Sequence, residues 1–75
     1  MQISIKMNPS MVKEFIAITS KCDFDIDIAA SNRYYVDAKS IIGVLGLDMT
    51  RPLVIEYNGY NEDLENFIKR NAVAC

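Results

Sequence analysis

Ser40 carries a hydroxyl group at the point where a short helix is expected to begin. It follows Lys39 and precedes the apolar run 41–47, which ends at Asp48. A phosphate on a serine at the start of a helix would add about −1.5 to −2 charges, where free backbone N–H groups and the helix dipole attract anions. The same serine could instead serve only as an N-cap, which is worth about 1 kcal/mol. Both interpretations of Ser40 stay open from the sequence.

The other polar residues do not form a recognisable catalytic or metal-binding pattern. The sequence has no histidine, the usual nucleophile and general base near neutral pH. Asp23, Asp25 and Asp27 alternate along one segment, but the further oxygen ligands and the glycine-bent loop of a calcium site do not accompany them. We interpret these aspartates as the solvent-facing side chains of a strand. We therefore expect no metal ion, no cofactor and no enzymatic activity.

Composition and charge argue against several classes of partner. The 75 residues carry a net charge of −2 without a basic stripe, so a nucleic acid would find no electrostatic attraction. No apolar run reaches the roughly 18 residues of a membrane helix. The first residues, MQISIKM, lack the layout of a signal peptide, and we expect a cytoplasmic protein.

The two cysteines, Cys22 and Cys75, are expected to be free thiols, since a reducing cytoplasm disfavours disulfides. Cys22 follows the first predicted helix at its C-terminal end, where the helix dipole raises the pKa of a thiol. A reactive nucleophile at this position is therefore not expected.

Hydrophobic periodicity predicts seven elements in the order β-α-β-β-α-β-α. The strand segments alternate apolar and polar residues, whereas the helical segments repeat apolar residues every three or four positions. The expected N-caps are Asn8, Ser40 and Asn61, and Ser31-Asn32 is the expected hairpin turn. The expected strands are 2–7, 24–28, 33–37 and 53–58, and the expected helices are 9–21, one to two turns after Ser40, and a last segment after Asn61.

These elements predict a single α/β (α+β) domain over residues 1–75, built as an open-faced sandwich. Four mostly antiparallel strands would form one sheet, with the helices packed on one of its faces. Because a helix joins the first two strands, these should run parallel, and another strand can lie between them in the opposite direction. The residues expected to be buried are Phe15, Ile18, Ile26, Ile55, Leu64, Phe67 and Ile68.

The apolar run after Ser40 is too long for a helix of one or two turns to bury. Ile41, Ile42, Val44 and Leu45 are distributed around the helix at about 100° per residue, so they cannot all face the core. One or two of them should meet solvent, and an exposed apolar cluster often marks a binding surface.

The segment DAKSIIGVLGLD, residues 37–48, resembles the AKSIMGVMSL segment of the HPr phosphocarriers of the bacterial sugar phosphotransferase system. The element order is consistent with that family, and EFIAITSKCDFDIDI resembles its first helix and second strand. The resemblance implies an HPr-like fold and a phosphate carried on a histidine just before the first helix. Here that position falls at Asn8, the position of a following arginine falls at Ser10, and the loop is shorter. Because an amide nitrogen is not nucleophilic, we expect the fold without the phosphate transfer.

The same resemblance implies a role for the apolar run. In the HPr family, a regulatory kinase phosphorylates the serine that matches Ser40, and a transcription factor reads the phosphorylated form. Partners of the family also dock on exposed residues of the second helix. The matching positions here are Lys39, Ile41, Ile42 and Leu45. Val44 and Leu47 are expected to be buried, and the domain is expected to bind protein partners without catalysis.

Two other functions stay open from the sequence. The chain could take part in phosphotransfer through another residue or another chain. It could also sense a small ligand, since β-α-β-β-α-β sheets occur in amino-acid-binding regulatory domains. Those domains usually carry a glycine-rich turn after the first strand, and MNPSM at this place has no glycine.

Overall fold

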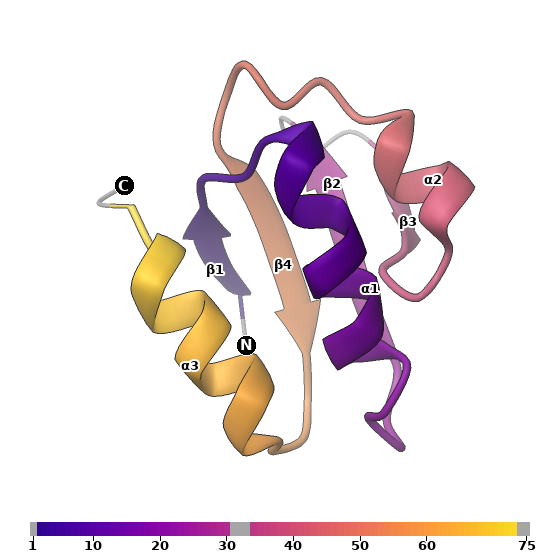
Figure 1. The fold of residues 1–75 in the computed structure, drawn as a ribbon, viewed down its shortest axis with the longest axis vertical. Coiled ribbons are helices and arrows are strands. Elements are labelled where there is room, and N and C mark those ends of the chain that lie inside the picture. Colours follow the sequence, from indigo (N-terminus) through magenta and orange to yellow (C-terminus); the bar gives the residue numbers. More distant parts are fainter. Residues whose placement is uncertain (1, 31–33, 74–75) are drawn as a thin grey trace.

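The computed structural model describes residues 2–30 and 34–73, in which strands and helices follow the expected order (Figure 1). The expected helix 9–21 is divided into a 3₁₀ turn and an α-helix, and the expected hairpin turn at Ser31-Asn32 lies outside the described residues. The elements are β1 (Gln2–Ile5), the 3₁₀ turn η1 (Pro9–Met11), α1 (Val12–Thr19), β2 (Ile26–Ala30), β3 (Tyr34–Asp37), α2 (Ile41–Leu45), β4 (Leu53–Tyr57) and α3 (Glu62–Asn71).

The four strands form one sheet in the order β1-β4-β2-β3, and every neighbouring pair is antiparallel. Since β4 lies antiparallel to both β1 and β2, those two strands run parallel to each other, as expected from the helix between them. Ile55 pairs with Ile3 on one side and with Ile28 on the other, which sets the apolar rows in register. The prediction of an α+β fold with a four-stranded, mostly antiparallel sheet is confirmed.

The core lies between the sheet and the helices, which Figure 1 shows in front of the strands. Phe15 of α1 and Phe67 of α3 meet there, with their ring centroids 5.4 Å apart. Alternate residues of the strands face the same layer, because successive side chains of a strand point to opposite faces. Of the residues expected to be buried, six are buried: Phe15, Ile26, Ile55, Leu64, Phe67 and Ile68.

Ile18 is the exception, because it is half-buried rather than buried. The inward face of α1 runs through Val12, Phe15 and Thr19, which are three and four residues apart. Thr19 can lie inside because its hydroxyl donates to the carbonyl oxygen of Ala38 over 2.9 Å, so this buried hydroxyl is paired. This hydrogen bond joins α1 to the turn that precedes α2.

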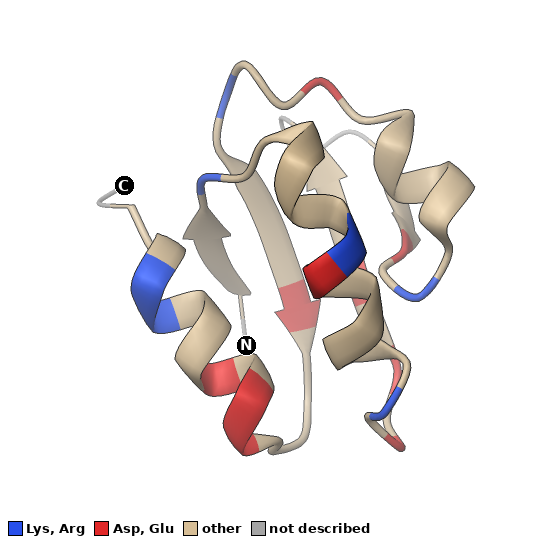
Figure 2. Ribbon diagram, viewed as in Figure 1, with Lys and Arg blue, Asp and Glu red and all other residues tan. Residues whose placement is uncertain are grey.

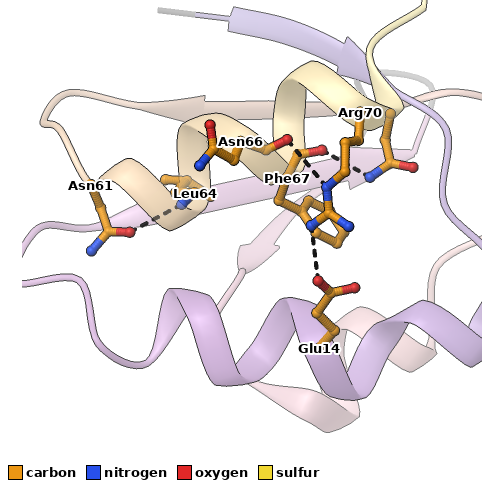
Figure 3. Close-up of polar contacts among 7 residues, drawn as sticks. Glu14, Asn61, Leu64, Asn66, Phe67 and Arg70 are labelled. Carbon is orange, nitrogen blue, oxygen red and sulfur yellow. Dashed lines mark hydrogen bonds and ion pairs between the residues drawn. The ribbon is translucent and has the colours of Figure 1, made fainter.

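The helix α3 is fixed at both ends by polar contacts. Asn61 caps it as expected, since its side-chain oxygen accepts the backbone N–H of Leu64 over 3.0 Å (Figure 3). Near the other end, the guanidinium of Arg70 donates to the carboxylate of Glu14 on α1 over 2.9 Å. The side chains of Arg70 and Glu14 are 58% and 50% exposed, so this ion pair adds little to the stability of the fold. Figure 2 shows acidic residues at the start of α3 and basic residues near its end, which suits the helix dipole.

The chain after α3 covers the outer edge of β1. The backbone N–H of Val73 donates to the carbonyl oxygen of Ser4 over 3.0 Å. The backbone N–H of Lys6 donates to the carbonyl oxygen of Asn71 over 2.8 Å. Ala72 forms an antiparallel bridge with Ile5 between these two bonds. Residues 71–73 therefore protect an edge that another chain could otherwise pair with.

Phe24 lies before β2, although the alternation of the sequence predicts it inside that strand. Its ring is stacked on that of Tyr57, with the centroids 5.8 Å apart, and it covers Gly59 in the turn after β4. A Cβ atom added to Gly59 would lie only 2.4 Å from the ring of Phe24. The glycine is therefore needed for close approach between the segment before β2 and the turn after β4.

We expect Gly59→Ala to lower the free energy of unfolding by about 1–3 kcal/mol, because the aromatic ring must move away from Tyr57. Urea denaturation of the variant and the parent measures this difference. The matched control is Gly46→Ala, since Gly46 has helical backbone angles and an added Cβ there would make only ordinary contacts. The explanation is contradicted if the two variants have the same midpoint.

Candidate functional site

The helix α2 begins at a serine cap, as expected. The hydroxyl oxygen of Ser40 accepts the backbone N–H of Gly43 over 3.3 Å, and the backbone of Ser40 is extended (φ −98°, ψ 110°). The helix has five residues, Ile41–Leu45, and Gly46 forms its C-cap. A helix this short depends on its contacts with the rest of the protein rather than on its own hydrogen bonds.

Most of the apolar surface of α2 faces solvent. Val44 is fully buried, whereas Ile41, Ile42 and Leu45 are 47%, 83% and 52% exposed. We call these three exposed side chains the α2 patch. Figure 2 shows that no charged residue interrupts α2. The exposure expected for these three residues and the burial expected for Val44 are confirmed, but Leu47 is half-buried rather than buried.

The α2 patch is held in place by contacts with α1 and β3. Gly43 faces Val36 of β3 so closely that a Cβ atom added to it would lie 3.3 Å from the Cβ of Val36. The ammonium group of Lys39 donates to the carbonyl oxygen of Cys22, just after α1, over 2.9 Å. Lys39, which was expected at the partner-binding surface, is thus half-buried and joins the start of α2 to the end of α1.

Gly43 is a residue of this site that sequence reasoning did not single out. Glycine inside a helix costs about 1 kcal/mol relative to alanine, and this cost is itself a signal of close packing. Here the missing side chain lets the backbone of α2 approach Val36.

Asn8 and Ser10, the positions that match the HPr phosphocarrier site, make a local cap instead. The side-chain oxygen of Asn8 accepts the backbone N–H of Ser10 over 3.0 Å and also accepts the hydroxyl of Ser10. Pro9 follows the cap at the first position of η1. The structure therefore brings the two residues together, and their polar atoms start the 3₁₀ turn before α1.

Cys22 is a buried free thiol. It donates to the carbonyl oxygen of Ile18, and burial raises its pKa, although the nearby ammonium of Lys39 acts in the opposite direction. A raised pKa reduces the thiolate fraction, so the structure offers no activated nucleophile at this residue. Cys75 lies outside the described residues.

Tyr57 is the other buried group with a shifted pKa. Burial raises the pKa of its hydroxyl, and the hydrogen bond that this hydroxyl donates to Glu65 over 2.6 Å raises it further. The pair links β4 to α3, and Tyr57 remains protonated at neutral pH.

No protein-family model matches the chain, and no curated protein matches it significantly. The resemblance to HPr therefore rests on the segments quoted above. Within residues 2–30 and 34–73, no group of three histidine, cysteine, aspartate or glutamate residues is placed to hold a metal ion. None of the helices in those residues has the length and apolar character needed to cross a membrane.

Proposed function

We propose that this chain is an HPr-like, non-catalytic domain that binds protein partners through the α2 patch, in a pathway related to the bacterial sugar phosphotransferase system. The observation that carries the proposal is the exposure of Ile41, Ile42 and Leu45 on a helix whose opposite side is anchored by Val44. Large aliphatic side chains clustered on a small surface more often mark a contact than an accident.

The contacts that hold α2 also favour binding. Gly43 packs on Val36, and the Lys39 ammonium is hydrogen-bonded to the carbonyl oxygen of Cys22. The helix that carries the α2 patch is therefore fixed on two sides. A surface that is already ordered loses less conformational entropy when a partner docks. The element order and the residues 37–48 support the HPr-like assignment, while the Asn8–Ser10 cap supports a domain without phosphate transfer.

Ser40 is proposed as the control point of this surface. Its side chain is exposed, and its hydroxyl lies at the start of the same helix that carries the patch. A phosphate there would place about −1.5 to −2 charges beside the patch. Phosphorylation would therefore change which partner the α2 patch accepts.

The test is capture of partners from the lysate of the source cell by the immobilised protein. We expect Ile42→Asp and Leu45→Asp to abolish capture with little change in melting temperature, because both side chains are exposed. Ser40→Asp should alter the set of captured proteins while keeping a capping oxygen.

The matched control is Tyr60→Asp, which introduces the same charge at an aromatic side chain that is 73% exposed and lies outside α2. Capture that survives Ile42→Asp, or that is lost equally in Tyr60→Asp, would show that the α2 patch is not the binding surface. A large loss of melting temperature in Leu45→Asp would instead place Leu45 in the core.

A further inference from the structure

A hollow of about 300 Å³ lies at the end of the sheet where the chain enters η1. The segments that border it are the β1–η1 connection, η1 itself, the connection from α2 to β4 and the end of α3, and Figure 1 shows the first three at the same end of the molecule. The residues that line the hollow are Lys6, Met7, Asn8, Met11, Met49 and Asn71.

All three methionines within residues 2–30 and 34–73 line this one hollow. Met7 belongs to the core, and Met11 and Met49 are half-buried against it, so these last two side chains lie at the boundary between core and solvent. They come from three separate segments, and the Asn8–Ser10 cap fixes the turn that carries Met11. The fold therefore brings three methionines to one hollow, although Met49 is far from Met7 and Met11 in the sequence.

The chemistry of these side chains selects one class of ligand. A thioether is a soft, neutral donor that carries no proton at any ordinary pH, and such donors prefer Cu(I) to hard cations. No carboxylate, imidazole or thiolate belongs to the residues that line the hollow. The side-chain oxygens of Asn8 and Asn71 are too few for Ca²⁺, which takes roughly 6–8 oxygen ligands, and Zn²⁺ would find neither imidazole nor thiolate. The Lys6 ammonium is the single charge of the lining, and it would repel any cation.

We propose that this hollow binds Cu(I) through the thioether sulfurs of Met7, Met11 and Met49. Binding is a simple coordination in which the copper stays in the +1 state, so no electron or proton is transferred. The site shares no residue with the α2 patch, and the two proposals can fail independently.

The experiment transfers Cu(I) from a coloured Cu(I) chelator to the protein in the absence of oxygen. Because a thiolate binds Cu(I) more strongly than a thioether, the parent for this experiment carries Cys22→Ala and Cys75→Ser. We expect this protein to remove one copper ion per chain from the chelator. Met7→Leu, Met11→Leu and Met49→Leu should each weaken binding about tenfold or more, since even the loss of a group that only orients a ligand costs about 10–100-fold.

Leucine preserves the volume and apolar character of methionine, and the melting temperature of each variant reports whether the fold is kept. Lys6→Gln is a control that should change the Cu(I) affinity in the opposite direction, because removal of the repelling charge should strengthen binding. X-ray absorption spectroscopy of the copper-loaded parent should show three sulfur neighbours around the copper ion. If a variant fails to fold, this number of sulfur neighbours alone tests whether the three methionines bind copper. The proposal is overturned if the chelator keeps its copper, if any Met→Leu variant binds as tightly as the parent, or if fewer sulfurs are counted.

Discussion

Phe67→Ala is expected to lower the free energy of unfolding by about 3–5 kcal/mol, because it removes a fully buried aromatic ring from the layer between α3 and α1. The ring of Phe15 would lose its neighbour at 5.4 Å, and the guanidinium of Arg70, 5.6 Å above the ring of Phe67, would lose its support. Domains have a net stability of about 0.05–0.15 kcal/mol per residue, or roughly 4–11 kcal/mol for a chain of this length. The variant should therefore lose a large share of its stability, and it would unfold at room temperature if the parent lies at the low end of this range.

Circular dichroism during urea and thermal denaturation measures this effect. The matched control is Tyr60→Ala, which removes an aromatic side chain that is 73% exposed and should change stability by no more than about 0.5 kcal/mol. A Phe67→Ala protein that melts like the parent would show that the Phe15–Phe67 contact is not the centre of the core.

The strand pattern and the helix caps of this protein could be predicted because they are local. Alternation fixes which residues of a strand share a face, and Asn8, Ser40 and Asn61 each bond to a backbone N–H two or three residues away. Such interactions can be predicted because both partners lie close together in the sequence. The parallel orientation of β1 and β2 also follows from the helix between them, whereas the sequence did not identify β4 as the strand that lies between them.

The differences from the expected fold arise where distant residues decide the outcome. Thr19 replaces Ile18 on the inner face of α1 because the carbonyl oxygen of Ala38 is placed to accept its hydroxyl. Phe24 leaves the β2 segment because Tyr57 and Gly59 offer its ring a packing surface. Neither partner is close in sequence, so periodicity alone could not identify these contacts.

The candidate site shows the same division. The exposure of Ile41, Ile42 and Leu45 could be anticipated because a short helix can bury only part of its circumference. The hydrogen bond from Lys39 to the carbonyl oxygen of Cys22 could not be anticipated from the sequence, because it depends on how α1 and α2 are placed relative to each other. That bond assigns Lys39 a structural role in addition to the binding role expected from the sequence.

Val44→Asp is expected to be the most damaging substitution in α2, because it places a carboxylate in a fully buried position. An unpaired charge in the core costs several kcal/mol, so either the carboxyl group stays protonated or α2 leaves the core. Burial would raise the pKa of this aspartate above its ordinary value of about 3.9. The folded state would then bind more protons than the unfolded state, and the stability of the variant should fall as the pH rises from about 4 toward 7.

Denaturant midpoints of the parent, Val44→Asp and Val44→Asn at about pH 4 and pH 7 separate charge from shape. The asparagine variant has nearly the same volume without a titrating group, so its loss of stability relative to the parent should be the same at both pH values. Val44→Asp should be destabilised more at the higher pH, and hydrogen exchange of the α2 amides should become faster there as the helix detaches. It should also lose partner capture although Ile41, Ile42 and Leu45 are unchanged, since the α2 patch binds only when Val44 anchors it. Equal midpoints for Val44→Asp and the parent at pH 7 would mean that Val44 does not anchor α2, and the α2 patch would then lack the fixed geometry on which its proposed function depends.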